Sequence, residues 1–356
     1  MTGAGYRVEQ FSLSQAEPAA LARLISEVFE HHGKDTGGSI AFDDATFRLI
    51  FSAPGADPEL FVRVTEGGEL VGFLGGIPRV VSVRGAERRM VVPAWASVHH
   101  AHQRRGLALE MGSALLRIAR ERGYDGGVAM FEPEAHGIDT ARSVMRREGL
   151  ALSEWCRVKH FLIRILDVDA ALRAASLGRI ERLALGALER APEPESRRVR
   201  LLRADDHGRV FELCRDHLAR NDVAMVRERD ELSWYLSQPD VVTVVHEDDR
   251  GEVDGFLSAW RMLLAGFGNR VPFGWLDLVH VHRLPGREAR DLTRGLCLHA
   301  GRRGWAGLQM PHLPYFGATP LWRARFVPYP KQLIVAAVSF DAPLPPRPRG
   351  VYLDWR

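Results

Sequence analysis

The clearest pattern of apolar and polar positions lies around one basic loop. An apolar run over residues 91–98 predicts a strand, and the basic loop follows it. Apolar residues then recur every three or four positions, which predicts a helix over 107–122 that ends at Gly123. Another apolar run, 127–131, predicts the next strand. The alternation of strand and helix is typical of an α/β protein.

The rest of the first half has the same alternation. Further helices are predicted over residues 16–31, 43–52 and 139–147. Further strands are predicted over residues 6–11, 59–65, 70–74, 80–83 and 155–165. Residues 168–190 predict an amphipathic helix, and the Pro- and Glu-containing stretch 191–196 predicts a linker.

The second half repeats the first. The segment Val-Gly-Phe-Leu at 71–74 returns as Asp-Gly-Phe-Leu at 254–257, and Val98-His99 returns as Val279-His280. Arg-Gly-Tyr at 122–124 returns as Arg-Gly-Trp. These agreements predict a tandem duplication. The expected division is a first domain, a helix with a linker, a second domain and a proline-rich tail, over residues 1–166, 167–196, 197–342 and 343–356.

Composition narrows the class of protein. The chain has 356 residues, 46% of them hydrophobic, which is enough for two buried cores. It contains no apolar run long enough for a membrane helix and no pattern of a secretory signal. Three widely spaced cysteines fit a reducing compartment, so we expect a cytoplasmic protein, as monomer or homodimer. A net charge of +3 is too small to indicate nucleic-acid binding.

The basic loop has the chemistry of an anion site. Residues 103–108 read Gln-Arg-Arg-Gly-Leu-Ala. The first amide N–H groups of a helix have no partner within it, and the helix dipole favours negative charge there. Gly106 has no side chain to block a phosphate. We therefore expect this loop to bind a phosphate group.

This segment resembles the pyrophosphate-binding loop of the GCN5-related N-acetyltransferases (GNAT), where Arg/Gln-x-x-Gly-x-Gly/Ala follows a strand; His100 replaces the family's usual Pro. The resemblance implies an α/β (α+β) fold of two tandem GNAT-like domains, each a mixed, mostly antiparallel sheet flanked by helices, as in mycothiol synthase. It implies acetyl-CoA or another acyl-CoA as co-substrate, with the pantetheine arm lying between two splayed strands. The residues expected to bind it are Val98, His99, Gln103, Arg104, Arg105, Gly106, Leu107 and Ala108.

The second copy of the loop differs at each of these features. Leu284 replaces Gln103, Pro285 removes an N–H donor, and Arg287 stands at the glycine position. Glu288 adds a negative charge. We expect only the first half to bind acyl-CoA, with the second half shaping the substrate cleft; the alternative is that Arg287 holds a phosphate through its side chain.

The family's usual catalytic groups are missing. Met145 stands at the position of the family's acidic Tyr, and Val92 at the position of a Glu base used by histone-acetylating members. The remaining candidates follow the predicted strand 127–131; they are Glu132, His136 and Asp139, with Glu132 preferred over Glu134. A C-terminal carboxylate on Arg356 is a further candidate. His99, His100 and His102 flank the loop, but strand alternation separates them, so no metal is expected.

These observations predict an acyl-CoA-dependent N-acyltransferase that transfers an acetyl or other acyl group to the amine of a small molecule in a ternary complex. The acceptor is expected to contact residues 31–35 and the first two helices. One alternative is a GNAT-fold transferase that takes its donor from aminoacyl-tRNA. The other is a non-catalytic acyl-CoA-binding protein.

Overall fold

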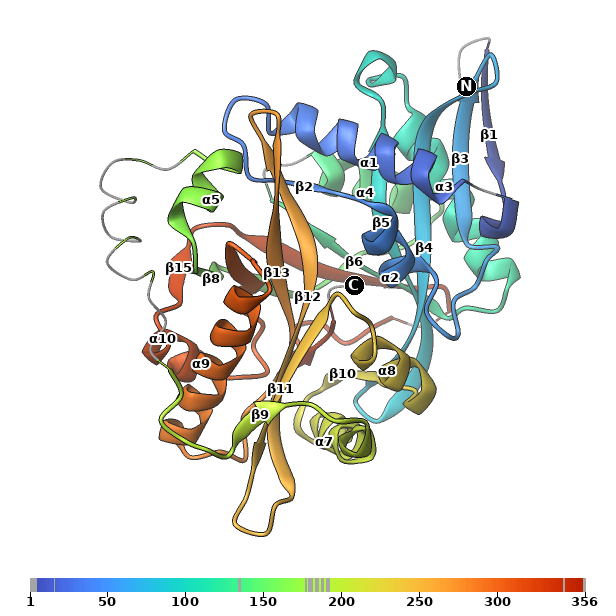
Figure 1. The fold of residues 1–356 in the computed structure, drawn as a ribbon. Helices are drawn as coiled ribbons and strands as arrows, with labels where there is room; N and C mark the ends of the chain where they lie inside the picture. The colour runs from blue at the N-terminus through green and yellow to red at the C-terminus, as the bar shows by residue number, and fades with distance from the viewer. Residues whose placement is uncertain are drawn as a thin grey trace.

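Two sheets form the framework of the molecule (Figure 1). The computed structural model describes residues 5–15, 17–133, 136–176, 178, 182, 186, 189, 193–341 and 343–354. Its α-helices are α1 Pro18–His32, α2 Asp44–Phe51, α3 Leu107–Glu121, α4 His136–Arg147, α5 Val168–Ala174, α7 His207–Arg220, α8 Arg229–Leu236, α9 Gly286–Arg302 and α10 Thr319–Arg323. None of the described helices is long and apolar enough to cross a membrane.

Within the described residues, the first sheet has nine strands. Its main path runs β1-β3-β4-β5-β6-β16-β7; β10 pairs with β4, and β17 with β10. The strands are β1 Tyr6–Gln10, β3 Phe61–Glu66, β4 Glu69–Val83, β5 Ala86–Val98, β6 Gly126–Phe131, β7 Ser153–Val158, β10 Val223–Val226, β16 Leu333–Ser339 and β17 Val351–Tyr352.

The second sheet has eight strands in the described part of the chain. Its path runs β15-β8-β14-β13-β12-β11-β9, with β2 beside β12. The strands are β2 Ser39–Ala41, β8 Phe161–Ile165, β9 Val199–Leu201, β11 Val241–Glu247, β12 Val253–Gly266, β13 Asn269–His280, β14 Gly307–Pro311 and β15 Val327–Tyr329. Neighbours are antiparallel except β5 with β6, β13 with β14 and β10 with β17. The predicted fold class is confirmed.

The two halves exchange strands. β16, from the end of the chain, lies between β6 and β7 in the first sheet, and β8, from the first half, pairs with β14 and β15 in the second. β10 and β2 cross in the same reciprocal way. Each sheet is therefore completed by the other half of the chain. The predicted boundaries at residues 166 and 197 do not separate the two sheets, and the division into folding units stays a prediction.

One predicted strand is two. The run 155–165 was expected to form a single closing strand, but it forms β7 and β8, which belong to different sheets. The chain leaves one sheet and enters the other at Lys159 and His160, which lie outside both strands. No glycine or proline interrupts the sequence between the two strands, so the pattern does not reveal the crossing. Of the predicted helix 168–190, the structure describes α5 and only isolated later residues.

The duplication is visible in matching local geometry. α3 and α9 both end in an Arg-Gly pair: Arg122 has φ −87° and ψ 6°, and Arg303 has φ −88° and ψ 6°. Gly123 and Gly304 both have φ +74°, the left-handed conformation that glycine adopts without strain after a helix. The order of elements around these helices also matches, with α1 and α7 preceding, and β6 and β14 following.

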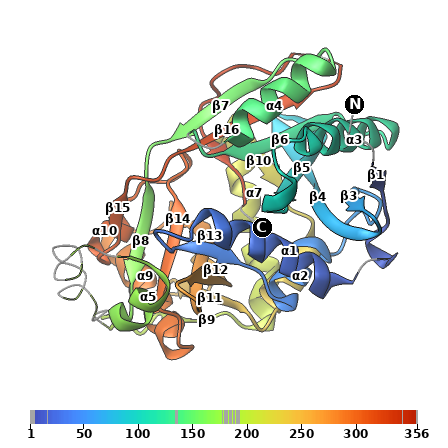
Figure 2. The same cartoon turned by 90° about the horizontal axis from the view of Figure 1, so that it is seen from above.

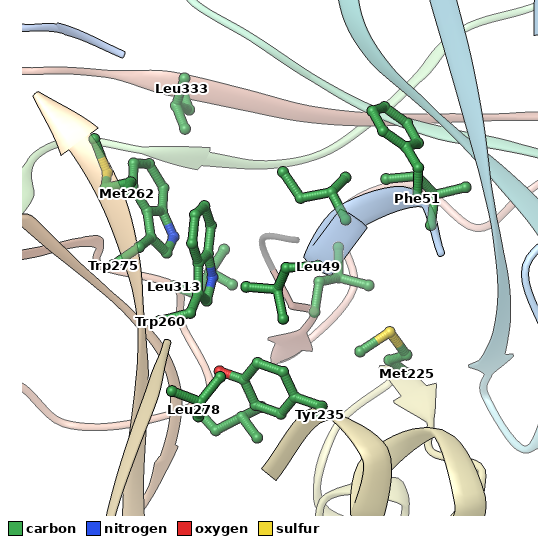
Figure 3. Packing of buried hydrophobic residues seen from close by; sticks show 14 of the residues in the cluster. Leu49, Phe51, Met225, Tyr235, Trp260, Met262, Trp275, Leu278, Leu313 and Leu333 are labelled. Atoms are coloured by element: carbon green, nitrogen blue, oxygen red, sulfur yellow. The ribbon is translucent and has the colours of Figure 1, made fainter. Parts of the chain in front are cut away.

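The halves share a central core (Figure 3). α1 and α2 lie between the two sheets, whereas α3 and α4 lie on the outer side of the first sheet (Figure 2). In the central core, Phe51 on α2 and Met225 on β10 lie in the same apolar cluster as Trp260 on β12 and Leu333 on β16. Separate apolar clusters hold α3 on the first sheet and α9 on the second. Burial of apolar surface between the halves therefore fixes their arrangement.

Ion pairs also join the halves. Asp43, the N-cap of α2, accepts a hydrogen bond from Arg261 on β12 over 2.7 Å. Near the end of the chain, Asp354 is almost fully buried and lies 3.2 Å from Arg79 on β4 and 3.1 Å from Arg227 after β10. These contacts fix the segment after β17 between the two halves, since buried charges are stable only when paired.

Candidate functional site

β5 and β6 separate immediately after their first contacts. They are paired in parallel only at Met90 with Gly126 and at Val91 with Gly127. Farther along β5, its register with β4 shifts between residues 94 and 97, and Trp95 has φ +59°. Beyond Val91, the edge of β5 that faces away from β4 therefore has no partner strand among the described residues. Its main-chain groups can pair with an extended ligand.

The bulge in β5 is held by aromatic packing. The Trp95 ring lies edge-on to Phe29 of α1, with ring centroids 5.5 Å apart, and to Phe42 before α2, at 4.5 Å. These contacts hold a residue in the left-handed region, which costs roughly 1–3 kcal/mol. The adjacent Ala96 is exposed on the separated part of the strand. Strained backbone of this kind is common at functional sites.

The loop after β5 has backbone geometry that is compatible with the predicted anion site. Gly106 is the N-cap of α3 with φ +76°, and a side chain there would meet no atom within 4 Å. Arg104 also has a positive φ, +60°. The first helical hydrogen bond runs from the Glu110 amide to the Gly106 carbonyl at 3.1 Å. The amides just before Glu110 lie in the first turn, where no helical carbonyl reaches them, and they remain available to an anion.

The other predicted loop residues have distinct roles. The Gln103 amide donates to the Val98 carbonyl over 3.0 Å, which ties the loop to the end of β5. Leu107, the first residue of α3, is buried, so its side chain anchors the helix. Ala108 is half-buried. Arg104 is exposed. The structure thus brings Val98 and residues 103–108 together at one place, as the sequence predicts.

Two residues from the first sheet, which the sequence did not indicate, orient this loop. Tyr6 on β1 is hydrogen-bonded to the Arg105 guanidinium and to Nδ1 of His102, the latter at 3.0 Å. Glu66 on β3 lies 3.3 Å from His102 and 3.9 Å from Arg105. They come from strands far from the loop in sequence, and no local motif marks them. Through these contacts, Tyr6 and Glu66 hold the Arg105 side chain beside the proposed anion site.

A group of histidines lies at the end of β5. His31, in the last turn of α1, stacks on His100 with ring centroids 4.3 Å apart, and His99 lies 4.2 Å from His100. Burial lowers the pKa of His99, and His100 and His102 lower it further. Desolvation and the neighbouring His100 also lower the pKa of His31. A neutral imidazole at neutral pH can accept a proton.

The three predicted catalytic residues are all exposed. Glu132, just past β6, forms an ion pair with Lys331 at 2.6 Å. Asp139, in the first turn of α4, lies 3.5 Å from Arg142 and is 75% exposed. His136 begins the same helix and is exposed. Their roles stay predictions; Glu134 and Arg356 lie outside the described residues.

The comparisons with known proteins bear on this geometry. Residues 12–131, which include β5, the anion loop, α3 and β6, match the family model described as an acetyltransferase (GNAT) domain. The match covers 120 of the 356 residues, all of them in the first half of the chain. The resemblance predicted from the loop is thereby confirmed.

The chain is also similar to proteins named glycylpeptide N-tetradecanoyltransferase and N-myristoyltransferase. Glycylpeptide N-tetradecanoyltransferase of Kluyveromyces lactis is 25% identical over 242 residues, 62% of this chain and 49% of that protein. The chain thus spans about half the length of the curated relative. N-myristoyltransferase of Saccharomyces cerevisiae with bound myristoyl-CoA has the same fold, with a TM-score of 0.72 over 96% of this chain and 80% of that one, at 14% identity. A GCN5-related N-acetyltransferase from Kribbella flavida matches with a TM-score of 0.50 and 16% identity over 95% of this chain and 72% of that one.

The position of the usual GNAT acid is apolar and buried. Met145 on α4 packs against Leu116 of α3 and Val338 of β16. It also lines a cavity of about 320 Å³ between α4 and strands β16 and β7, whose rim carries Arg142 and Glu154. A thioether has no proton to give, so a leaving thiolate cannot take one from this side chain.

The second GNAT-like half closes its copy of the loop with its own side chains. Arg287 and Arg294, on α9, donate to the Glu195 carboxylate over 3.1 and 2.9 Å, and Arg290 lies 3.2 Å from it. Leu284 packs over Gly255, where an added Cβ would lie 2.6 Å from it. The Glu195 carboxylate thus pairs with the arginines that would otherwise bind a phosphate. Comparison of the two loop sequences did not indicate this contact.

Proposed function

We propose that this protein is an N-acyltransferase that binds acyl-CoA in its first half and transfers the acyl group to an amine. The observation that carries the proposal is the combination of the separated β5 and β6 with the open anion site at Gly106. The pyrophosphate would bind the amides at the start of α3, and the pantetheine would pair with the free edge of β5. The thioester would then lie beside Ala96 to Val98, where a backbone N–H can stabilise the oxyanion.

The proposed reaction is direct attack. The amine nitrogen forms a bond to the thioester carbon, the carbon–sulfur bond breaks, and CoA leaves as a thiolate. The amine loses one proton to a general base. Two positions are available for that base: His99 at the end of β5, whose pKa is lowered by burial, and the exposed Glu132 past β6. The CoA thiolate leaves without help from Met145.

The acceptor is proposed to be a small-molecule amine. A second acceptor class, a peptide with an N-terminal glycine, is favoured by the similarity to glycylpeptide N-tetradecanoyltransferase. The same similarity makes a tetradecanoyl group a donor to test beside acetyl. α1 and α2, which lie between the two sheets, are the elements we expect to contact the acceptor (Figure 2).

A matrix of donors and acceptors tests the proposal. The purified chain is incubated with acetyl-, octanoyl- or tetradecanoyl-CoA and with a small-amine mixture or a glycyl peptide. Released CoA thiol and the mass of the acylated product are measured. We expect acceptor-dependent thiol release with at least one pair. Tight acyl-CoA binding with no transfer to any acceptor would favour a non-catalytic binding protein, and absence of acyl-CoA binding would refute the proposal, leaving aminoacyl-tRNA as the donor to examine.

A further inference from the structure

A second group of histidines lies in the other half of the molecule, apart from the proposed acyl-CoA site. His217 is on α7, His280 ends β13, and His282 follows two residues later. One ring nitrogen of each lies within 4.8 Å of the others. His217 and His280 are each 1% exposed, and the side chain of His282 is 13% exposed. The three imidazoles therefore converge on one largely buried point.

Several of these nitrogens lack hydrogen bonds in the described structure. They are Nε2 of His217, Nδ1 of His280 and both ring nitrogens of His282. The backbone of Leu213 and the Asp216 side chain approach His280 and His282, respectively, as hydrogen-bond partners of loose geometry. A buried polar atom with no partner costs about 1–3 kcal/mol. Three such groups at one place are costly for a core, and one shared ligand would satisfy them together.

The opposite nitrogens are oriented by neighbours. Nε2 of His280 lies 3.2 Å from the Tyr352 hydroxyl, and Nδ1 of His217 lies 3.4 Å from the Asn221 amide. The His217 ring also stacks on Tyr352 at 4.6 Å. In metal sites, a histidine ligand is usually oriented by a hydrogen bond at its other nitrogen. His217 and His280 show this arrangement, with their unpaired nitrogens left free.

One carboxylate lies beside the histidines, and Arg220, Arg227 and Arg283 also lie near them. Asp216 lies 3.5 Å from Nε2 of His282 and is also paired with Arg283 at 2.5 Å. Neutral imidazole nitrogens are preferred ligands of zinc and similar ions.

The first half has a partly matching group. His99 at the end of β5 corresponds to His280 at the end of β13, whereas His100 aligns with Val281; His31 and His217 both lie in the last turn of a helix, α1 and α7. In the second half the loop that follows has lost its open anion site to Glu195. The histidines there consequently need a role that does not depend on a CoA phosphate.

We propose that His217, His280 and His282 bind one divalent transition-metal ion of the Zn²⁺ type, with Asp216 or water as fourth ligand. Ligand nitrogens around tetrahedral zinc lie about 3.3 Å apart, given zinc–nitrogen bonds of about 2.0–2.1 Å. The separations between the histidine nitrogens must therefore shorten by roughly 1.5 Å at most. His282 is the least buried of the three residues. The ion joins α7 to the end of β13 and, through Tyr352, to the end of the chain.

The test uses the full chain without a histidine tag, stripped with EDTA and titrated with Co²⁺ and Zn²⁺. Calorimetry gives stoichiometry and Kd, and the visible Co²⁺ spectrum reports ligand geometry. We expect one ion per chain and a Zn²⁺-dependent rise in Tm. His282→Gln should weaken binding by more than the roughly 10- to 100-fold that loss of an outer partner costs.

Two further variants give the controls. His299→Gln removes a half-buried histidine of α9 outside the group and should bind Zn²⁺ as the wild type does. His100→Gln removes a histidine of the first-half group and should also bind normally. No saturable binding in the wild type, equal binding by folded His282→Gln, or loss of binding in His100→Gln alone would each overturn the proposal. His282→Gln serves as the main variant because its partial exposure favours folding; circular dichroism confirms it.

Discussion

Replacing Gly106 by Asn and by Asp separates folding from phosphate binding. Gly106 has φ +76°, and an added Cβ meets no atom within 4 Å, so the cost to stability is conformational. Asn and Asp tolerate this left-handed conformation best among residues with side chains, and both are favourable N-caps. We therefore expect each variant to lose about 1 kcal/mol of folding free energy or less.

The effect on binding should be much larger for Asp than for Asn. Both side chains obstruct the approach of a phosphate to the α3 amides, but only Asp adds a negative charge. Two unit charges about 6 Å apart at an effective dielectric constant near 20 repel by roughly 3 kcal/mol, and exposure to salt reduces this to about 1–2 kcal/mol. Gly106→Asp should therefore bind CoA about 5- to 30-fold more weakly than Gly106→Asn.

Calorimetry with CoA at two salt concentrations measures this difference, since repulsion should shrink as salt rises. Gly85→Asp is the matched control: this residue has φ +85° in the turn between β4 and β5, with open space around it. It should bind CoA normally. Wild-type affinity in folded Gly106→Asp would refute the anion site, and equal weakening in Gly85→Asp would show that the effect is not local.

Three further predictions follow from the same structure. Calorimetry should find one acyl-CoA site per chain, because Glu195 occupies the arginines of the second loop; two equivalent sites would contradict this. Burial raises the pKa of Asp43, but hydrogen bonds from the Thr46 amide and Arg261 outweigh burial and lower this pKa overall. The contribution of the Asp43 carboxylate to folding stability is therefore present above the unfolded pKa near 4 and is lost as pH falls through the lower folded value. Asp43→Asn should thus cost about 1 kcal/mol in urea unfolding at pH 7 and less near pH 3; a pH-independent difference would exclude the ion pair as its cause. If His99 is the base, activity should rise with pH through a pKa below 6.5, and this rise should be absent in His99→Gln. If the rise is absent in Glu132→Gln instead, Glu132 is the base.

Most local features could be predicted from the sequence. The helix α3, its loop and the strand β6 follow from short-range periodicity and from glycine at positions where the backbone must turn. The proposed anion site could also be inferred from the sequence, because its donors would be consecutive amides at the start of one helix. The duplication was visible since equivalent residues recur at similar spacing, and it correctly indicated that the second loop differs from the first.

The tertiary structure decided which segments meet. Residues 333–338 are a continuous apolar run, and their pairing with β6 and β7 joins segments about two hundred residues apart in the sequence. Other contacts also join residues far apart in sequence. They are Tyr6 with Arg105, Glu195 with the arginines of α9, and His217 with the histidines at and just after the end of β13. Local sequence sets backbone conformation and which face is apolar; the choice of partner comes from the shared core, where burial of apolar surface from both halves forces strands to exchange and brings distant polar side chains to one point.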